Sequence, residues 1–137
     1  MNISVSQMQG NVPVTVIKLD GRLDGQNYQE LVTKAQELHS AGARNFLLDL
    51  SELAYVSSSG LVALCSVAML ARGEKLPDAP EGRPVLRPLV HAAETGPQKH
   101  FKLLKPRAEI MHTFEMVGLS MLFEVFSDLD EAVRSFS

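Results

Sequence analysis

The sequence predicts a small α/β domain, in which a mixed sheet of about five strands carries its helices mainly on one face. Two observations carry this prediction. Short segments rich in β-branched and other apolar residues alternate with longer segments in which apolar residues recur at helical spacing. The chain has 137 residues, of which 45% are hydrophobic and 21% are charged. This size and composition are typical of one globular domain, which we expect to span residues 1–137.

The first 25 residues predict a hairpin that leads into a turn. Residues Asn2–Met8 alternate as in a strand, a Gly-Asn pair offers a turn, and Val12–Leu19 is rich in β-branched residues. Pro13 is typical of an edge strand or of the entry into a strand. We expect the N-terminal strand to lie at an edge of the sheet. Segment 20–25, Asp-Gly-Arg-Leu-Asp-Gly, predicts a turn-rich connection.

A strand–helix–strand unit follows. From Gln26 to Ser40 the apolar residues recur at intervals of three and four, which predicts a helix with one buried face. Gly42 is placed to end this helix, and the next strand is expected at Asn45–Asp49. Because strand–crossover–strand connections are right-handed, the two strands should be parallel neighbours.

The stretch 47–64 is organised around three consecutive serines. It reads as a buried strand, a short bend, then Ser57, Ser58 and Ser59, and a helix from about Gly60 to Arg72 that is apolar almost all round. Only one residue can occupy the N-cap of a helix, so at least one hydroxyl is not needed for local structure. A helix start offers unpaired N–H groups and a partial positive charge, which would stabilise a phosphate on these serines. Capping and a polar turn alone are the alternative interpretation.

Residues 73–100 differ in character from the rest of the chain. They hold five of the seven prolines, together with interspersed charges of both signs. A connection of this length without regular structure is uncommon inside a compact domain, and it is typical of a functional loop or of disorder. We interpret 73–100 as an insertion. It is either a mobile linker or, through its apolar segment Pro84–Val90, a docking segment.

The C-terminal part predicts a strand, a helix, a strand and a helix. Phe101–Leu104 reads as a short strand, and Pro106 suits the start of a helix that ends at Gly118. A last strand is expected at Leu122–Phe126, and Asp128 is a good N-cap for the final helix. The apolar face of this helix is formed by Leu129, Ala132, Val133 and Phe136.

Three motifs occur in order along the chain. They are Gly-Arg-Leu-Asp at 21–24, then Asp-Leu-Ser at 49–51 with Val-Ser-Ser-Ser-Gly-Leu at 56–61, then the Phe-rich segment 114–126. Together they resemble the signature of the STAS domain, the anti-sigma-factor antagonist family of bacteria. The chain departs from that pattern at Ser57, where the family commonly has Asp, and at Val117, where it usually has a small hydroxyl residue. The resemblance covers nearly the whole chain except the insertion.

The resemblance implies partner switching in bacterial transcription regulation and stress response. Such an antagonist binds an anti-sigma factor that is also a serine-protein kinase, and so frees the sigma factor until the kinase phosphorylates the antagonist. By position the phosphoacceptor is Ser58, with Ser57 and Ser59 as alternatives. A phosphatase is a further candidate partner. The implied partner-binding residues are Asp24, Asp49, Ser57, Ser58, Ser59 and Gly60. For Asp24, a local role at the start of a helix is an equal alternative.

Several classes of function find no support in the sequence. There is no phosphate-binding glycine loop or serine-hydrolase elbow, and the four histidines lack metal-ligand spacing, so we expect neither an enzyme nor a metal or cofactor site. The net charge of −3 argues against nucleic-acid binding, and no apolar run is long enough to cross a membrane. A single cysteine, Cys65, and no visible secretory signal predict a cytoplasmic protein.

A second function stays open at this point. A STAS module that is never phosphorylated could act as a scaffold or as the binder of a small ligand, such as a nucleotide or a lipid. The serine at position 57, in place of the family's usual Asp, favours this alternative. The sequence does not predict an oligomeric state.

Overall fold

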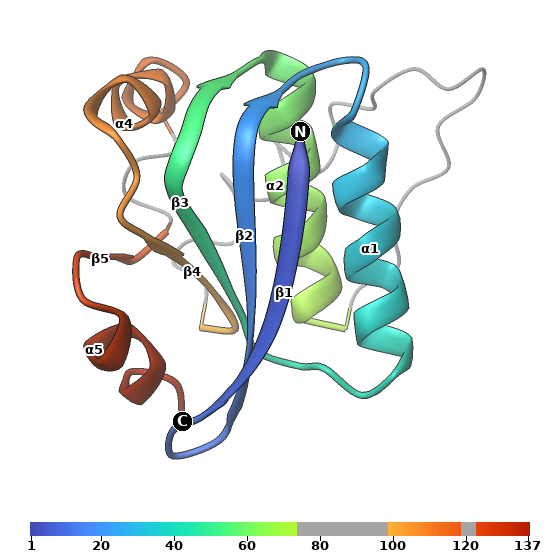
Figure 1. Cartoon of the computed structure of the whole chain (residues 1–137), viewed down its shortest axis with the longest axis vertical. Helices are drawn as coiled ribbons and strands as arrows, with labels where there is room; N and C mark the ends of the chain where they lie inside the picture. Colours follow the sequence, from blue (N-terminus) through green and yellow to red (C-terminus); the bar gives the residue numbers. More distant parts are fainter. Residues whose placement is uncertain (74–98, 119–122) are drawn as a thin grey trace.

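The computed structural model describes residues 1–73, 99–118 and 123–137. Its centre is a five-stranded sheet in the order β1-β2-β3-β4-β5 (Figure 1). Strand β1 is antiparallel to β2, whereas β2 to β5 are parallel to one another. The predicted α/β class with a mixed sheet is confirmed, and the N-terminal strand lies at an edge as expected. Nearly all of the predicted insertion at 73–100, including Pro84–Val90, lies outside the described residues.

The bounds of the elements are as follows. The strands are β1 (Asn2–Gln9), β2 (Pro13–Leu23), β3 (Phe46–Val56), β4 (Phe101–Leu104) and β5 (Val125–Phe126). The helices in the described part of the chain are α1 (Tyr28–Ser40), α2 (Ser58–Ala71), α4 (Ala108–Met116) and α5 (Leu129–Arg134).

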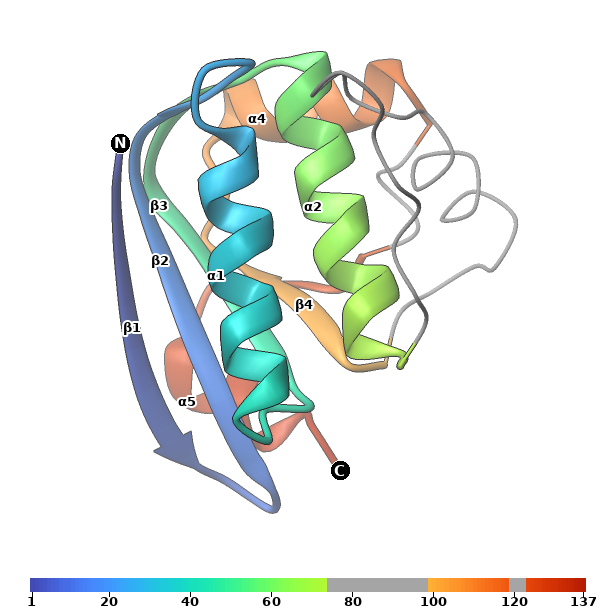
Figure 2. The same ribbon diagram turned by 90° about the vertical axis from the view of Figure 1, so that its right-hand side faces the viewer.

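The helices cover the two faces of the sheet unequally, as predicted. Helices α1 and α2 lie side by side on one face (Figures 1 and 2), where they enclose the larger hydrophobic core with side chains such as Ile17, Leu48 and Leu64. Helix α5 packs on part of the other face through Val133, which forms a smaller core with β2, β3 and β4. Phe136 belongs to the same core but lies two residues beyond the end of α5, not on the helix as predicted. Helix α2 is apolar on nearly every side, and most of it is buried.

The end of α1 follows the sequence prediction. Gly42 has a φ of +114°, a value that favours glycine. Its N–H donates to the carbonyl of His39 at 3.0 Å, and the N–H of Ala43 donates to the carbonyl of Leu38 at 3.0 Å. These two bonds form a Schellman motif, which satisfies the last carbonyls of α1 and turns the chain toward β3.

Two strands are longer than predicted, and here the sequence analysis was wrong. Strand β2 continues through the expected turn to Leu23, and β3 continues through the expected bend to Val56. The two strands stay paired because their register shifts between Lys18 and Asp20 and again after Gly21. Such bulges keep an irregular sequence inside a sheet, and they hide the period-2 pattern by which a strand is recognised.

The C-terminal elements match the prediction with one difference. Strand β4 has the predicted bounds, and the carboxylate of Asp128 caps α5 by accepting a hydrogen bond from the N–H of Asp130 at 3.2 Å. Helix α4 begins two residues after Pro106, and the chain leaves it at Gly118, whose φ is +78°. Strand β5 is shorter than predicted, and the expected start at Leu122 lies outside the described residues.

Candidate functional site

Most of the predicted site residues lie at the end of the sheet where β2 and β3 terminate. Leu23 and Val56, the last residues of these strands, are cross-strand partners. The N–H of Ser57 donates to the carbonyl of Leu23 at 2.9 Å. This hydrogen bond holds together the points where the chain leaves β2 and β3. Helices α1 and α2 both begin at this end (Figures 1 and 2). In α/β proteins, the carboxyl ends of parallel strands are the usual place for a binding site.

Ser57 is the N-cap of α2. Its backbone is extended, and its hydroxyl accepts a hydrogen bond from the N–H of Gly60 at 3.2 Å. Its carbonyl accepts the N–H of Leu61 at 2.9 Å, which closes the first turn. The helix therefore begins at Ser58, two residues earlier than predicted. Since Ser and Asp cap helices about equally well, the replacement of the family's Asp keeps the cap and removes only its charge.

The hydroxyls of Ser58 and Ser59 are the two that capping does not use. Ser58 is exposed and Ser59 is half-buried. Within the described part of the chain, neither hydroxyl takes part in a hydrogen bond. Both residues lie in the first turn of α2, where backbone N–H groups have no acceptor inside the helix and the macrodipole is positive. The first turn also carries no acidic residue. A negative group on Ser58 would thus be stabilised by the helix.

Asp24 lies in the loop between β2 and α1, beside the serines. Gly25, its neighbour in the chain, is so close to Ser59 that a Cβ on this glycine would lie 3.6 Å from the Ser59 hydroxyl. The carboxylate of Asp24 accepts a hydrogen bond from the N–H of Gln26 at 3.0 Å. The N-cap of α1 is Asn27, not Asp24. Asp24 therefore shapes the loop that borders the serines, and its half-exposed carboxylate places a negative charge at this end of the sheet.

Asp49 is not near the serines, contrary to the expectation. It lies in the first half of β3, opposite Lys18 of β2, and its carboxylate accepts bonds from the N–H of Ser51 at 3.0 Å and from the hydroxyl of Ser51 at 2.7 Å. The rest of β3 separates it from Ser57, a path of about 26 Å at the usual rise per residue. The predicted bend after Asp49 would have brought the two together, and the observed strand keeps them apart.

Sequence reasoning missed a pair of side chains that adjoins the site. The guanidinium of Arg22 lies 4.3 Å from the ring centroid of Tyr55, and the two residues are cross-strand partners. Each stands immediately before the last residue of its strand. Tyr55 is 41% exposed. Arginine and tyrosine are enriched at the centres of protein interfaces. The signal was hidden because Arg22 was assigned to a turn, although a pairing of β2 with β3 up to Val56 would have revealed it.

The described residues do not support a reactive thiol, a metal site or a membrane-spanning helix. Cys65 is buried in α2, and burial raises the pKa of its thiol to about 12, so the group stays protonated at neutral pH and is not a nucleophile. Over residues 1–73, 99–118 and 123–137 there is no group of three His, Cys, Asp or Glu side chains that could hold a metal ion. None of the described helices is long and apolar enough to cross a membrane.

The family follows from a match to known sequences. A family model described as "Mlab, STAS domain" matches residues 6–77, which is just over half of the chain. The chain belongs to the STAS domain family. The match includes β2, β3 and the serine-capped start of α2, the elements that build the site. Comparison with curated proteins finds no match.

Solved structures share the fold of this STAS domain. A Thermotoga maritima protein proposed to be an anti-sigma factor antagonist matches with a TM-score of 0.68 and 12% identity, over 95% of this chain and 90% of that one. The anti-sigma factor antagonist SpoIIAA in its unphosphorylated form gives 0.61 and 19%, over 96% and 93%. The phosphorylated form of SpoIIAA from Bacillus gives 0.57 and 16%, over 96% and 96%. This STAS domain is thus similar in fold to anti-sigma factor antagonists.

Proposed function

We propose that this STAS protein is an anti-sigma factor antagonist, which binds an anti-sigma factor with serine-kinase activity and is released when Ser58 is phosphorylated. The observation that carries the proposal is the exposed hydroxyl of Ser58 in the first turn of α2, which bonds to no described residue while Ser57 supplies the cap. SpoIIAA, a structural relative, exists in both phosphorylated and unphosphorylated forms. An ATP-dependent kinase partner implies a cytoplasmic location and a role in transcription regulation.

In the unphosphorylated state the end of the sheet is suited to burial against a partner. The hydroxyls of Ser58 and Ser59 are neutral donors and acceptors, so their desolvation is compensated by hydrogen bonds to the partner. Arg22 and Tyr55 add an exposed planar pair at the same end of the sheet. Asp24 contributes the acidic group that a basic residue of the partner would meet.

Phosphorylation changes the charge of this surface without requiring a change of fold. The kinase transfers the γ-phosphoryl group of ATP to the Oγ atom of Ser58, the hydroxyl proton passes to a base of the kinase, and ADP leaves. The phosphoserine adds a charge of about −1.5 to −2. The first turn of α2 stabilises this charge within the antagonist. When the same charge is buried against the partner, it costs roughly several kcal/mol of binding free energy. The complex therefore dissociates.

Phosphosite mapping on the protein from its native cells tests this proposal. Cleavage after Arg44 and Arg72 releases one peptide that carries Ser57, Ser58 and Ser59, and fragmentation of that peptide assigns the site. We expect a phosphate on Ser58. A peptide that is never modified, in growth or under stress, would favour the alternative of a constitutive scaffold or ligand-binding STAS module.

The affinities of two matched variants at Ser58 distinguish control by charge from a non-specific loss of the binding surface. Ser58→Glu should weaken binding to the co-purified kinase by about a hundredfold or more, because it mimics part of the phosphate charge at the interface. Ser58→Ala loses at most one hydrogen bond to the partner, so it should weaken binding by about tenfold or less, and it should resist phosphorylation. If Ser58→Glu binds as tightly as Ser58→Ala, charge at this position does not control the partner.

A further inference from the structure

Within the described residues no strand pairs with the outer edge of β1, and the strand carries none of the usual protection of an edge. Strand β1 is the last strand on its side of the sheet (Figure 2), and it pairs only with β2. Its eight residues pair without a register shift, from Asn2 opposite Asp20 to Gln9 opposite Pro13. Natural edge strands are normally blunted by a charge, a proline, a bulge or a short length. The segment Asn-Ile-Ser-Val-Ser-Gln-Met-Gln has none of these features.

We propose that this edge pairs with β1 of a second copy of the same chain. The two strands run antiparallel about a two-fold axis, so that one sheet continues through both subunits. An isologous interface of this kind must be complementary to itself. β1 meets that condition because it holds no charge that would face its own copy across the axis.

The side chains of β1 select one register. Ile3 and Val5 lie on the helix side of the sheet, opposite Leu19 and Ile17 of the core, and both are half-buried. Ser4 and Ser6 lie on the other side and are exposed. A pairing centred on Ser4 places Ile3 against Val5 of the partner subunit. A shift by one residue would bring apolar side chains against serines. A shift by two residues in one direction would bring Ile3 against Gln7, and in the other direction it would leave only residues 1–5 paired.

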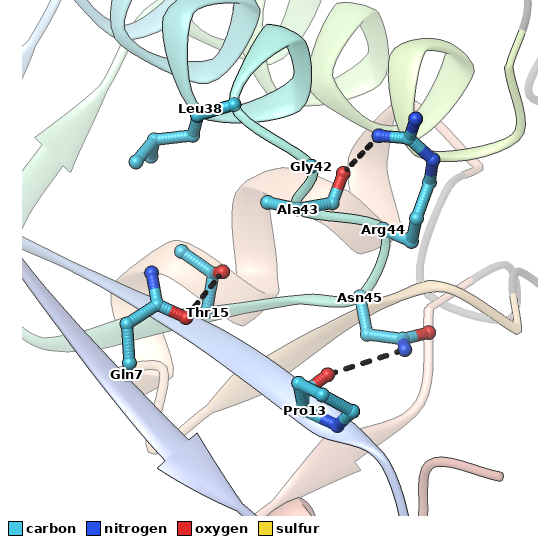
Figure 3. A pocket seen from close by; sticks show the side chains of 9 residues that line it. Gln7, Pro13, Thr15, Leu38, Gly42, Ala43, Arg44 and Asn45 are labelled. Atoms are coloured by element: carbon cyan, nitrogen blue, oxygen red, sulfur yellow. Dashed lines mark hydrogen bonds between the residues drawn. The ribbon is translucent and has the colours of Figure 1, made fainter.

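The flank of α1 supports the same arrangement. A hollow of about 340 Å³ lies between the end of α1 and the β1–β2 pair. Leu38 lines it from the helix, and Gln7 and Thr15 line it from the sheet (Figure 3). The flank of α1 that carries Leu38 therefore lies over the β1 side of the sheet. Lys34 lies one helical turn earlier on that flank, within 4.0 Å of Glu37. In the dimer the two α1 helices run antiparallel, so that this flank of each helix faces the same flank of the partner subunit.

The size of the interface predicts a weak dimer. Pairing of a single strand, with the flank of one helix, buries less than the roughly 1,200–2,000 Å² of a standard stable interface. We therefore expect monomer and dimer to exchange, with the dimer favoured at high protein concentration. This inference does not depend on the proposed partner switch, because the free edge of β1 is separate from the serines of α2.

Sedimentation over a broad range of concentrations tests the dimer. The variant Ser4→Lys/Ser6→Lys places like charges across the two-fold axis, and we expect it to stay monomeric where the wild type dimerises. The control Gln36→Lys/Ser127→Lys adds the same two charges at exposed positions away from β1, and it should dimerise as the wild type does. A monomeric wild type at every concentration, or equal behaviour of both variants, would overturn the proposal.

A disulfide tests the register. In the proposed pairing Ser4 faces Ser4 of the partner subunit, and opposed Cα atoms in antiparallel strands are about 4.5–5.5 Å apart, a distance that a disulfide can span. Ser4→Cys should therefore form a covalent dimer on mild oxidation. Ser6→Cys, which faces Asn2 of the partner subunit, should not. Crosslinking of Ser6→Cys alone, or of neither variant, contradicts this register. The native Cys65 is buried and stays silent in both variants.

Discussion

Gly60 lies against Leu23 with no room for a side chain. A Cβ atom on Gly60 would lie 2.7 Å from the carbonyl oxygen of Leu23 and 2.7 Å from Cγ2 of Val56. The carbonyl cannot easily move, because it accepts the N–H of Ser57 at 2.9 Å. The start of α2 is thus held directly against the ends of β2 and β3. This close approach explains in physical terms why a glycine follows the serines.

The variant Gly60→Ala should lower the free energy of unfolding by about 1–3 kcal/mol, because the added methyl group overpacks a rigid contact. This loss should outweigh the gain of roughly 1 kcal/mol that alanine normally brings to a helix. Urea unfolding measures the change. Gly25→Ala is the control, since its Cβ would meet only the Ser59 hydroxyl at an ordinary 3.6 Å. Equal stabilities of the two variants would show that the close approach is not what demands glycine.

The capping bond of Ser57 makes a second prediction. Ser57→Ala leaves the N–H of Gly60 without its acceptor and should cost about 1 kcal/mol of unfolding free energy. Ser57→Asp keeps an acceptor and adds a negative charge at the positive end of α2, so it should be at least as stable as the wild type. Ser58→Ala, which removes a hydroxyl with no bond in the described structure, should change stability by less than about 0.5 kcal/mol. A larger loss for Ser58→Ala than for Ser57→Ala would reverse the assignment of the cap.

The sequence predicted elements well where the apolar pattern is regular. Phe101–Leu104 was predicted with its observed bounds, because three of its four residues are apolar and polar residues stand on either side. Gly42 and Asp128 were recognised as helix ends because their roles depend on local backbone chemistry. The carboxyl halves of β2 and β3 were missed. Two register shifts there interrupt the alternation, and a glycine inside a strand reads as a turn.

The same error limited the prediction of the site. The serines were found because three hydroxyls cannot all cap one helix, and Ser58 is exposed at the start of α2 as expected. Asp49 was assigned to the site because it belongs to the Asp-Leu-Ser motif of the resemblance, but seven more residues of β3 separate it from the serines. The pairing of Arg22 with Tyr55 depends on a register that only the folded sheet defines.

Lys102 allows the contributions of packing and charge to be separated. It is only 4% exposed, its ammonium donates to the carbonyl and to the hydroxyl of Ser135 at 3.1 and 3.0 Å, and it lies 4.7 Å from the ring centroid of Phe136. It joins β4 to the end of α5. Lys102→Ala removes the buried stem together with the charge, and it should lower stability by about 2–4 kcal/mol.

Two companion variants decide the cause of that loss. Lys102→Met keeps the stem and removes the charge, and a buried charge replaced by a side chain of similar volume often costs little, so we expect a loss below about 1.5 kcal/mol. Glu124→Gln breaks the 3.7 Å ion pair with Lys102 at an exposed carboxylate and should cost less than about 1 kcal/mol. If Lys102→Met is as unstable as Lys102→Ala, the charge and its bonds to Ser135 hold α5 in place, and packing does not.

The buried thiol of Cys65 predicts a loss of stability at alkaline pH. Burial raises its pKa from the ordinary 9.0 to about 12 in the folded protein. As the pH rises above 9.0, the unfolded chain releases this proton and the folded chain does not. The unfolded state alone is therefore stabilised, and the free energy of unfolding falls. The contribution of Cys65 to stability is therefore fully present below pH 9.0 and is lost as the pH rises toward the folded pKa of about 12.

The measurement is urea unfolding of the wild type and of Cys65→Ala at a series of alkaline pH values. The variant lacks a methyl-sized volume in the core, which lowers its stability by a similar amount at every pH. Other groups, such as lysines and tyrosines, titrate equally in both proteins and cancel in the comparison. The wild type should therefore lose stability more steeply than the variant above pH 9.0. Parallel profiles, or rapid labelling of the native thiol near neutral pH, would show that Cys65 is reached by solvent and that its pKa is not raised.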